Sequence, residues 1–486
     1  MPLNGQATNV SLGLSVGYSM CGIAGIYKFN VNKRIDPEII TKMRDTLAHR
    51  GPDDNGVYLS PDKRFYLVNT RLSIIDLTSL AHQPMSDQKG SVWISYNGEI
   101  YNYLILQSEL KRKGYTFRSN SDTEIIIYGY EEWGIDGLLK RLRGMFAFAI
   151  YDSRAKDPKL ILARDRLGIK PLYYYQDNEL LIFASSVRAI VESGLIGRER
   201  NREADIAFLI FGNIPAHMTT VKNIFSMPCA SYMMVQNGKK RLVKYYELYD
   251  AFVRPKIKYH QDIYNNLLSI LTDTVNMHLV SDAPLGVFLS GGIDSSCLVG
   301  LASKMKSAPL TTLSVIFDEE QYNELPYQRM VAKRYGTDHR EIKVTEKDFY
   351  NEIDNVFDAM DQPTVDGINT YFVSRAAKQV GLKAVLSGLG GDEVFCGYES
   401  FGKIKLLKTI QGLPRLLRFP LALVGILNAK WRKLNFLRGN DEIGLYLSLR
   451  GLFSPPDVAR ILDITEKEVE EVLNNFQLST VNCQPC

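Results

Sequence analysis

The second half of the chain contains one short glycine loop between an expected strand and an expected helix. Residues 290–296 read Ser-Gly-Gly-Ile-Asp-Ser-Ser, after the apolar run Gly286–Leu289 and before a helical stretch over Ser295–Ser303. Backbone N–H groups in such a turn, together with a helix N-terminus, bind anions. The loop lacks the Gly-Lys-Ser/Thr ending of the P-loop in kinases and GTPases. It therefore predicts a phosphate site of another kind.

The rhythm of strand, loop and helix around this loop indicates the fold of the second half. Further strands are expected at 313–317, 342–344 and 383–386, and a helix is expected at 325–335. Strands that alternate with helices in this way are typical of a doubly wound parallel sheet. The second half is therefore predicted to be an α/β domain.

The first half has a different organisation, with groups of strands and inserted helices. Helix-period stretches cover 36–47 and 122–132. The expected strands lie at 23–27, 92–96, 145–150, 160–163, 172–175 and 181–184. Such grouping predicts an α+β layered domain. A polar stretch from about 235 to 263, with a turn at Asn237-Gly238, is expected to separate the two domains.

Composition limits the classes of protein that remain. A chain of 486 residues with 45% hydrophobic residues is long enough for two domains and an additional helical part. A net charge of +4 does not favour nucleic acid as a partner, and small polar substrates are expected instead. Six irregularly spaced cysteines indicate reduced thiols. With no apolar run of about 20 residues and no signal-peptide layout, we expect a cytoplasmic enzyme without membrane contact.

Cys21 follows Met20 directly, and this position suggests a nucleophile. If translation starts at Met20, removal of that methionine leaves Cys21 with a free α-amine beside its own thiol. Such an amine titrates near pH 8, so it can accept the thiol proton without a histidine partner. As written, however, the amine of Cys21 is a peptide nitrogen and cannot act as a base. We expect the true start at Met20, with residues 1–20 absent from the mature protein; a cleaved leader or an inactive glutaminase are the alternatives.

The motifs that follow resemble those of the N-terminal-nucleophile glutamine amidotransferases, which include asparagine synthetases. In order, they are Cys21-Gly22-Ile23-Ala24-Gly25, His49-Arg50-Gly51-Pro52-Asp53, Arg71-Leu72-Ser73-Ile74-Ile75-Asp76, Tyr96-Asn97-Gly98-Glu99-Ile100-Tyr101-Asn102 and Ser121-Asp122-Thr123-Glu124. Each motif alone is weak, but five in order over about a hundred residues are specific. The resemblance implies a four-layer α+β domain over 21–235 that hydrolyses glutamine.

The resemblance also implies a role for each group around the substrate. Cys21 is the nucleophile, and the Asn97 side chain with the Gly98 N–H stabilises the oxyanion. Arg71 binds the glutamine carboxylate. Asp122, helped by Glu99, binds the glutamine ammonium group. The implied set of residues that bind glutamine is Arg71, Leu72, Ile74, Asn97, Gly98, Glu99 and Asp122.

The glycine loop resembles the PP-loop of ATP pyrophosphatases, which attack the α-phosphate of ATP and release pyrophosphate. The implied ATP-binding residues are Phe288, Ser290, Gly291, Gly292, Asp294, Ser295, Ser296, Val315, Ser387 and Gly388. Asp294 and Asp392 are the implied Mg²⁺ ligands. Residues Asp361-Gln362-Pro363 to Asp366, and Tyr371, resemble the acceptor side of the asparagine synthetase family.

Together these resemblances imply a glutamine-dependent asparagine synthetase that uses glutamine, aspartate and ATP. The expected domains are an extension (1–20), a glutaminase (21–235), a linker (236–262), an ATP pyrophosphatase or synthetase domain (263–400) and a helical, truncated C-terminal part (401–486). A carboxylate attacks ATP to give an acyl-adenylate, and ammonia from the glutaminase then displaces AMP. The sequence leaves open whether the protein forms a homodimer.

Two departures from the family keep alternatives open. Leu389 stands where many asparagine synthetases carry a glutamate that is important for forming the adenylate. The family also normally continues past this length, with a later catalytic lysine. The alternatives are a related amidotransferase with another carboxylate acceptor, a glutaminase with an incomplete synthetase half, and a catalytically silent protein that binds nucleotide.

Overall fold

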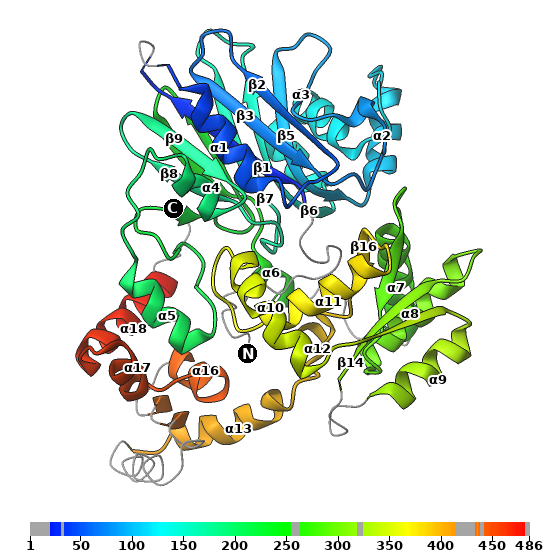
Figure 1. The fold of residues 1–486 in the computed structure, drawn as a ribbon, viewed down its shortest axis with the longest axis vertical. Coiled ribbons are helices and arrows are strands. Elements are labelled where there is room, and N and C mark those ends of the chain that lie inside the picture. Colours follow the sequence, from blue (N-terminus) through cyan, green and yellow to red (C-terminus); the bar gives the residue numbers. More distant parts are fainter. Residues whose placement is uncertain are drawn as a thin grey trace.

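A computed structural model gives the fold of this protein (Figure 1). It describes residues 20–30, 34–253, 263–317, 324–414, 433–434, 436–437 and 442–481. Residues 1–19 lie outside this set, so the expectation about the 1–20 extension is not addressed by the fold.

Two stacked antiparallel sheets form the centre of the N-terminal domain. In the described residues the first has the order β10-β8-β9-β1-β3-β2, and the second has the order β12-β11-β7-β6-β5-β4. The first sheet comprises β1 (Gly22–Lys28), β2 (Asp54–Leu59), β3 (Phe65–Arg71), β8 (Tyr173–Gln176), β9 (Leu180–Ala184) and β10 (Phe225–Ser226). The second comprises β4 (Met85–Ser86), β5 (Val92–Ile100), β6 (Gly144–Asp152), β7 (Lys159–Arg164), β11 (Ser231–Gln236) and β12 (Lys239–Lys244).

Helices cover the outer face of each sheet and complete four layers (Figure 1). The first sheet packs against α1 (Pro37–Leu47) and α4 (Val187–Glu192), and the second against α2 (Tyr103–Arg112) and α3 (Asp122–Arg141). Between the sheets, inward residues such as Phe65 and Leu162 form a third buried cluster. Three apolar interfaces between four layers confirm the predicted α+β architecture.

Local signals explain where these helices begin and end. The Asp36 side chain accepts from the Glu38 N–H, and Pro37 occupies the first helical turn of α1. Ser121 caps α3 in the same way. The prediction ended this helix near residue 132, whereas α3 continues to Arg141 through a kink at Gly134, whose φ is +63°.

The C-terminal domain is built on a parallel sheet, as predicted. Within the described residues its order is β15-β14-β13-β16, and every neighbouring pair is parallel. The strands are β13 (Leu285–Phe288), β14 (Thr311–Ile316), β15 (Asp338–Lys343) and β16 (Ala384–Leu386). β15 starts four residues earlier than predicted, because it is an edge strand and tolerates the charged residues Asp338 and Arg340.

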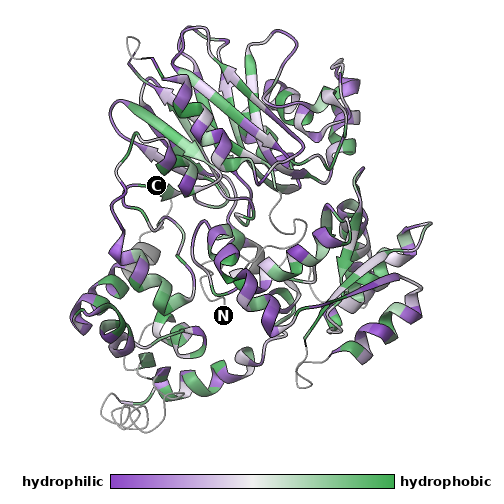
Figure 2. Ribbon diagram, in the orientation of Figure 1, coloured by the Kyte–Doolittle hydropathy of each residue, from purple (hydrophilic) through white to green (hydrophobic). Residues whose placement is uncertain are grey.

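Helices lie on both faces of this sheet, which confirms double winding. One face is covered by α7 (Ile263–His278), α8 (Ile293–Met305) and α9 (Leu325–Tyr335), through Val275, Val299 and Ala332. The other face is covered by α11 (Gly367–Gln379), on which α10 (Glu346–Ala359) packs. Helices of the lower half carry alternating hydrophobic and hydrophilic stripes, as expected when only one side is buried (Figure 2).

The predicted linker is wrong in its first part. Residues Lys239–Lys244 form β12, which pairs with β11 along its whole length through the turn at Asn237 and Gly238. Its residues are mostly exposed, so the lysine-rich sequence lacked the apolar alternation of a buried strand. The short helix α6 (Leu248–Val253) follows, and residues 254–262 lie outside the described set.

One helix within the range predicted for the glutaminase domain packs outside its two sheets. Helix α5 (Arg202–Phe211) does not cover either N-terminal sheet but packs against the C-terminal helices (Figure 1). These are α16 (Glu442–Arg450), α17 (Pro455–Leu462) and α18 (Glu466–Val481), reached from the sheet by α12 (Gly391–Phe395) and α13 (Glu399–Gln411). Ile206, Ala207 and Ile210 share a buried cluster with Leu447 and Val458. The apolar face of α5 therefore belongs to a helical unit that this helix forms with the C-terminal helices.

None of the described helices has the length and apolar character that crossing a bilayer requires. The cysteines in the described residues are free thiols.

Candidate functional site

Cys21 lies at the entrance to β1, against the loop that follows β3. Its Sγ accepts from the Leu72 N–H at 3.4 Å and lies 3.6 Å from the Leu72 carbonyl oxygen. Arg50 approaches from the other side and donates from Nε to the Cys21 carbonyl at 3.3 Å. These contacts hold the sulfur next to two of the motifs found in the sequence.

The thiol of Cys21 needs a base before it can attack a substrate. Burial raises the pKa of this thiol to about 11, although the Leu72 backbone acts in the opposite direction. The neutral thiol therefore dominates at pH 7, and it is a weak nucleophile. An adjacent amine that removes the proton would overcome this barrier.

Asn97 and Gly98, the predicted oxyanion residues, lie in the second half of β5. The Asn97 side chain is 1% exposed, and its Nδ2 has no hydrogen-bond partner among the described residues. A buried amide donor without a partner is costly, so a ligand oxygen is the expected partner. A Cβ at position 98 would lie 2.2 Å from the Met145 carbonyl oxygen, which explains the glycine.

Arg71 is 5% exposed at the end of β3, and it organises the loop after it. Its Nη2 donates to the carbonyls of Ile75 and Asp76, and its Nη1 donates to the Thr78 carbonyl. A guanidinium has five N–H donors, so donors remain for a substrate carboxylate. Arg71 therefore also stabilises its own loop, a structural role that was not predicted from the sequence.

Asp122 begins α3 and faces β5. Its Oδ2 accepts from the Tyr96 hydroxyl at 2.7 Å and from the Ile100 N–H at 2.9 Å. Burial raises the pKa of Asp122, while these two hydrogen bonds lower it. Burial and the charge of Asp122 also raise the pKa of Glu99 well above its usual range. A buried and a half-buried carboxylate whose charges repel each other in this way favour a cationic ligand, such as the ammonium group of an amino acid.

Lys170 is a site residue that the sequence analysis missed. It is 3% exposed, and its Nζ lies 3.6 Å from the Met20 sulfur. Burial lowers the pKa of Lys170 to about 8, although the charges of Glu99 and Cys21 act in the opposite direction. Asp165 fixes its backbone by accepting from the Lys170 N–H at 3.0 Å. No spacing rule marked this lysine, because it reaches the site from the turn after β7.

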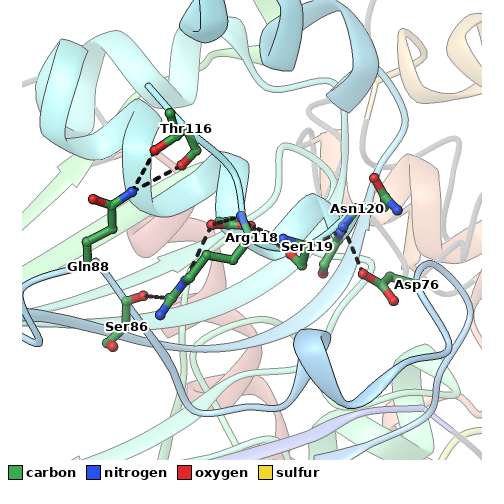
Figure 3. Close-up of polar contacts among 9 residues, drawn as sticks. Asp76, Ser86, Gln88, Thr116, Arg118, Ser119 and Asn120 are labelled. Carbon is green, nitrogen blue, oxygen red and sulfur yellow. Dashed lines mark hydrogen bonds and ion pairs between the residues drawn. The ribbon is translucent and has the colours of Figure 1, made fainter. Parts of the chain in front are cut away.

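Asp76 was noted as part of a motif, but its role was not predicted. Its Oδ1 accepts from the N–H and the hydroxyl of Thr78. Its Oδ2 accepts from the Asn120 N–H at 2.8 Å (Figure 3). Asn120 lies two residues before Asp122. Asp76 therefore joins the Arg71 loop to the segment that carries Asp122.

The second candidate site is the glycine loop between β13 and α8. Ser290 Oγ and Ser295 Oγ are 2.9 Å apart, and Ser296 Oγ donates to the Gly292 carbonyl at 2.7 Å. Gly291 has a φ of +84°, which a residue with a Cβ rarely adopts. The loop ends at the N-terminus of the 13-residue helix α8, a favourable place for a phosphate.

The loop after β16 packs directly on the glycine loop, because β13 and β16 are neighbours. A Cβ at Gly388 would lie 3.0 Å from the Ser295 nitrogen, and one at Gly391 would lie 2.2 Å from Asp294 Oδ2. Burial, followed by the charges of Asp392 and Glu393, raises the pKa of Asp294. The predicted metal ligands Asp294 and Asp392 are thus brought together.

The chemistry of this pair fits Mg²⁺, which commonly binds one or two carboxylates and completes its shell with water and phosphate oxygens. In the described residues no group of three or more His, Cys, Asp and Glu side chains forms a cage for a metal. Substrate phosphates would have to supply the remaining ligands.

The other predicted nucleotide residues lie at the same edge of the sheet. Val315 is near the end of β14, and Ser387 follows β16 directly. The Phe288 side chain packs in the apolar cluster of Leu313 and Val385, so a nucleotide contact would fall to its backbone.

Asp361 and Gln362, expected on the acceptor side, join the two domains. The Asp361 carboxylate accepts from the Ser186 hydroxyl and from the N–H groups of Val187 and Arg188 at the start of α4. The Gln362 side chain accepts from the Thr220 N–H at 2.9 Å. Both side chains are used to fix the relative positions of the domains.

Comparisons with known proteins agree with the two sites. Residues 20–246 match the family model described as a glutamine amidotransferase domain, and residues 266–463 match that described as asparagine synthase. The chain is 36% identical to a putative glutamine-hydrolysing asparagine synthetase 2 of Methanocaldococcus jannaschii, over 82% of this chain and 79% of the relative.

Two bacterial relatives are longer than this chain. Identity is 33% to asparagine synthetase 1 of Bacillus subtilis and 33% to asparagine synthetase B of Escherichia coli, over 81% and 79% of this chain. The match spans 61% and 66% of the length of these two relatives. Both family models, in the order that the fold gives them, cover most of the sequence. The chain therefore belongs to the family of glutamine-hydrolysing asparagine synthetases.

Proposed function

We propose that this chain makes asparagine from aspartate, ATP and glutamine, with Cys21 releasing ammonia and the glycine loop binding ATP. The observation that carries the proposal is the buried Asn97 amide, which lacks a partner in the described residues and lies in the motif beside Gly98. An oxyanion is the ligand that best completes such a donor.

In the first half-reaction the Cys21 sulfur attacks the side-chain amide carbon of glutamine. The carbonyl oxygen becomes an oxyanion that accepts hydrogen bonds from Asn97 Nδ2 and the Gly98 N–H. Collapse, with a proton from the α-ammonium group of Cys21, releases ammonia and leaves a glutamyl thioester, which water hydrolyses to glutamate. Arg71 and Asp122 hold the carboxylate and the ammonium of glutamine during these steps.

The proton of the Cys21 thiol goes to the α-amine of the same residue. This step needs a chain that begins at Cys21. Because the pKa of the Cys21 thiol is about 11, the thiol does not lose its proton at neutral pH without such a base. With an amine that titrates near pH 8, the thiol can be deprotonated as it attacks.

In the second half-reaction a carboxylate oxygen of aspartate attacks the α-phosphorus of ATP, and pyrophosphate leaves. The N–H groups at Gly291, Gly292 and the start of α8 hold the departing phosphates. Mg²⁺ on Asp294 and Asp392 would neutralise charge on them. Ammonia then attacks the acyl carbon, and AMP departs.

Met145 marks the route that ammonia takes between the sites. Its carbonyl oxygen faces Gly98, while the residue is 1% exposed in an apolar cluster with Val287 of β13 and with Leu289, which directly follows that strand and precedes the glycine loop. Neutral ammonia can pass through an apolar interior, whereas ammonium is excluded by its desolvation cost.

Product analysis tests the proposal. With glutamine, aspartate, ATP and Mg²⁺, AMP, pyrophosphate, asparagine and glutamate should form in equal amounts. Cys21→Ala should remove glutamine-dependent synthesis and retain synthesis from ammonium salts. Formation of ADP in place of AMP would show that the glycine loop is wrongly assigned.

Another carboxylate acceptor is the second candidate, and Leu389 favours it. This side chain is 53% exposed in the loop between Ser387 and Asp392, and it has no group that can act as acid, base or ligand. Pyrophosphate release measured with a panel of carboxylates separates the two cases. Aspartate should give the fastest release if the first candidate is right.

A further inference from the structure

The loop that follows Arg71 forms two hydrogen bonds with one residue of the synthetase domain. Asp282 donates its N–H to the Ile74 carbonyl at 3.0 Å, and its Oδ2 accepts from the Asp76 N–H at 2.8 Å. Asp76 is 5% exposed and has a φ of +54°, a conformation that favours glycine. The contact with Asp282 therefore holds the loop in a backbone conformation that is unfavourable on its own.

Lys383 makes a second connection to the same loop through Asp53. Its Nζ donates to Asp53 Oδ2 at 2.7 Å, and the same oxygen accepts from the Ser73 N–H at 2.8 Å. Lys383 is also tied to the neighbourhood of Asp282, because its N–H donates to the Pro284 carbonyl at 3.0 Å. Both residues thus act on one segment, residues 72–78.

This segment fixes the groups that meet glutamine. The carbonyls of Ile75 and Asp76 hold the Arg71 guanidinium, and the Asp76 carboxylate holds the Asn120 N–H next to Asp122. Leu72, at the start of the segment, holds the Cys21 sulfur. A shift of the loop would move the carboxylate grip, the ammonium site and the nucleophile together.

Asp282 and Lys383 lie shortly before β13 and β16, whose other ends lead into the glycine loop and the Ser387 loop. We propose that Asp282 and Lys383 are positioning residues of the glutaminase: the docked synthetase domain holds loop 72–78 in the conformation that binds glutamine. Glutamine is bound well only when β13 and β16, the strands that lead into the two nucleotide loops, are docked against this loop. The inference rests on the proposed use of glutamine at Cys21.

Steady-state glutamate release without ATP, measured over a range of glutamine concentrations, tests this inference. Asp282→Ala removes the acceptor for the Asp76 N–H and should raise the KM for glutamine about ten-fold. Asp282→Asn keeps a side-chain oxygen and should restore a KM near the wild-type value. Lys383→Met breaks a partly exposed ion pair and should raise KM about two-fold.

Arg340→Met is the matched control, because Arg340 forms an exposed ion pair with Asp338 on the same sheet, away from loop 72–78. It should leave KM unchanged. AMP formation from ammonium salts, ATP and aspartate shows that each variant is folded and should remain at the wild-type rate.

The outcomes are distinguishable. An Asp282→Ala variant with wild-type KM overturns the positioning role while the wild-type enzyme still hydrolyses glutamine. Equal losses in Asp282→Ala and Asp282→Asn also overturn it, because the asparagine retains the acceptor. A wild-type protein of confirmed N-terminus that releases no glutamate overturns the proposed function itself.

Discussion

The Asp282 carboxylate of the synthetase domain accepts a hydrogen bond from the backbone N–H of Asp76 at 2.8 Å. Asp76 in turn supports Arg71 through its carbonyl and the segment before Asp122 through its carboxylate. The glutamine site is therefore not a property of the N-terminal domain alone. Its geometry depends on a residue more than two hundred positions away in the sequence.

Asn97→Ala should reduce the kcat of glutamine hydrolysis roughly a hundred- to a thousand-fold, because it removes one oxyanion donor. The KM for glutamine should change little, since the donor acts mainly on the transition state. Gln88→Ala removes another amide, bonded to Thr116 on the exposed side, and serves as the control. A loss that appears only in KM would contradict the oxyanion role.

Tyr96→Phe tests the ammonium site. The Tyr96 hydroxyl lowers the pKa of Asp122 by hydrogen bonding, so its removal raises that pKa further. Because a protonated Asp122 attracts ammonium less, the KM for glutamine should rise, and its increase on acidification should begin at a higher pH than in the wild type. Tyr130→Phe removes a similar bond, to Asp152, and should not change this pH dependence.

Gly391→Ala tests the contact between the two nucleotide loops. A Cβ at this position would lie 2.2 Å from Asp294 Oδ2 and must displace that carboxylate. AMP formation should fall about a hundred-fold, since misplacement by about 1 Å has this effect, while glutamate release continues. Gly402→Ala, in α13 with open space around the Cβ, is the control and should retain AMP formation. Equal activity of the two variants would contradict a role of Asp294.

The reactivity of Cys21 should depend on pH and on the start of the chain. With residues before Cys21, the thiol pKa of about 11 predicts that alkylation by iodoacetamide rises about ten-fold per pH unit from 7 to 10. The thiolate is the reactive form, so the rate increases as pH rises. A chain that begins at Cys21 should react faster near pH 7. Subtraction of the rate for Cys21→Ala corrects for other thiols, and a flat profile in the longer chain would contradict the raised pKa.

Elements with local signals could be predicted from the sequence. Helix α9 has the predicted bounds, Leu325–Tyr335, because Pro326 begins it and Gly336, with a φ of +61°, ends it. β12 was missed because an exposed edge strand needs no apolar alternation. The packing of helix α5 against the C-terminal helices was not predicted, since an apolar face does not indicate which surface it meets.

The site residues, like the secondary-structure elements, include some that local sequence signals predict and others that they do not. Cys21, Asn97 and the glycine loop stand in contiguous motifs, so they could be proposed as site residues from the sequence. Lys170, Asp282 and Lys383 come from separate segments and approach the site only through packing. Arg71 was recognised, but its bonds to the carbonyls of its own loop follow from the turn at Asp76, whose positive φ no local rule predicts.

The most direct test of the account is the fate of the amide nitrogen of glutamine. The protein, with its N-terminus verified by intact mass, is incubated with amide-¹⁵N glutamine, aspartate, ATP and Mg²⁺ in excess unlabelled ammonium at pH 7. The account predicts asparagine that carries ¹⁵N, with one AMP formed for each asparagine. Unlabelled asparagine, or ATP cleaved to ADP, would contradict it.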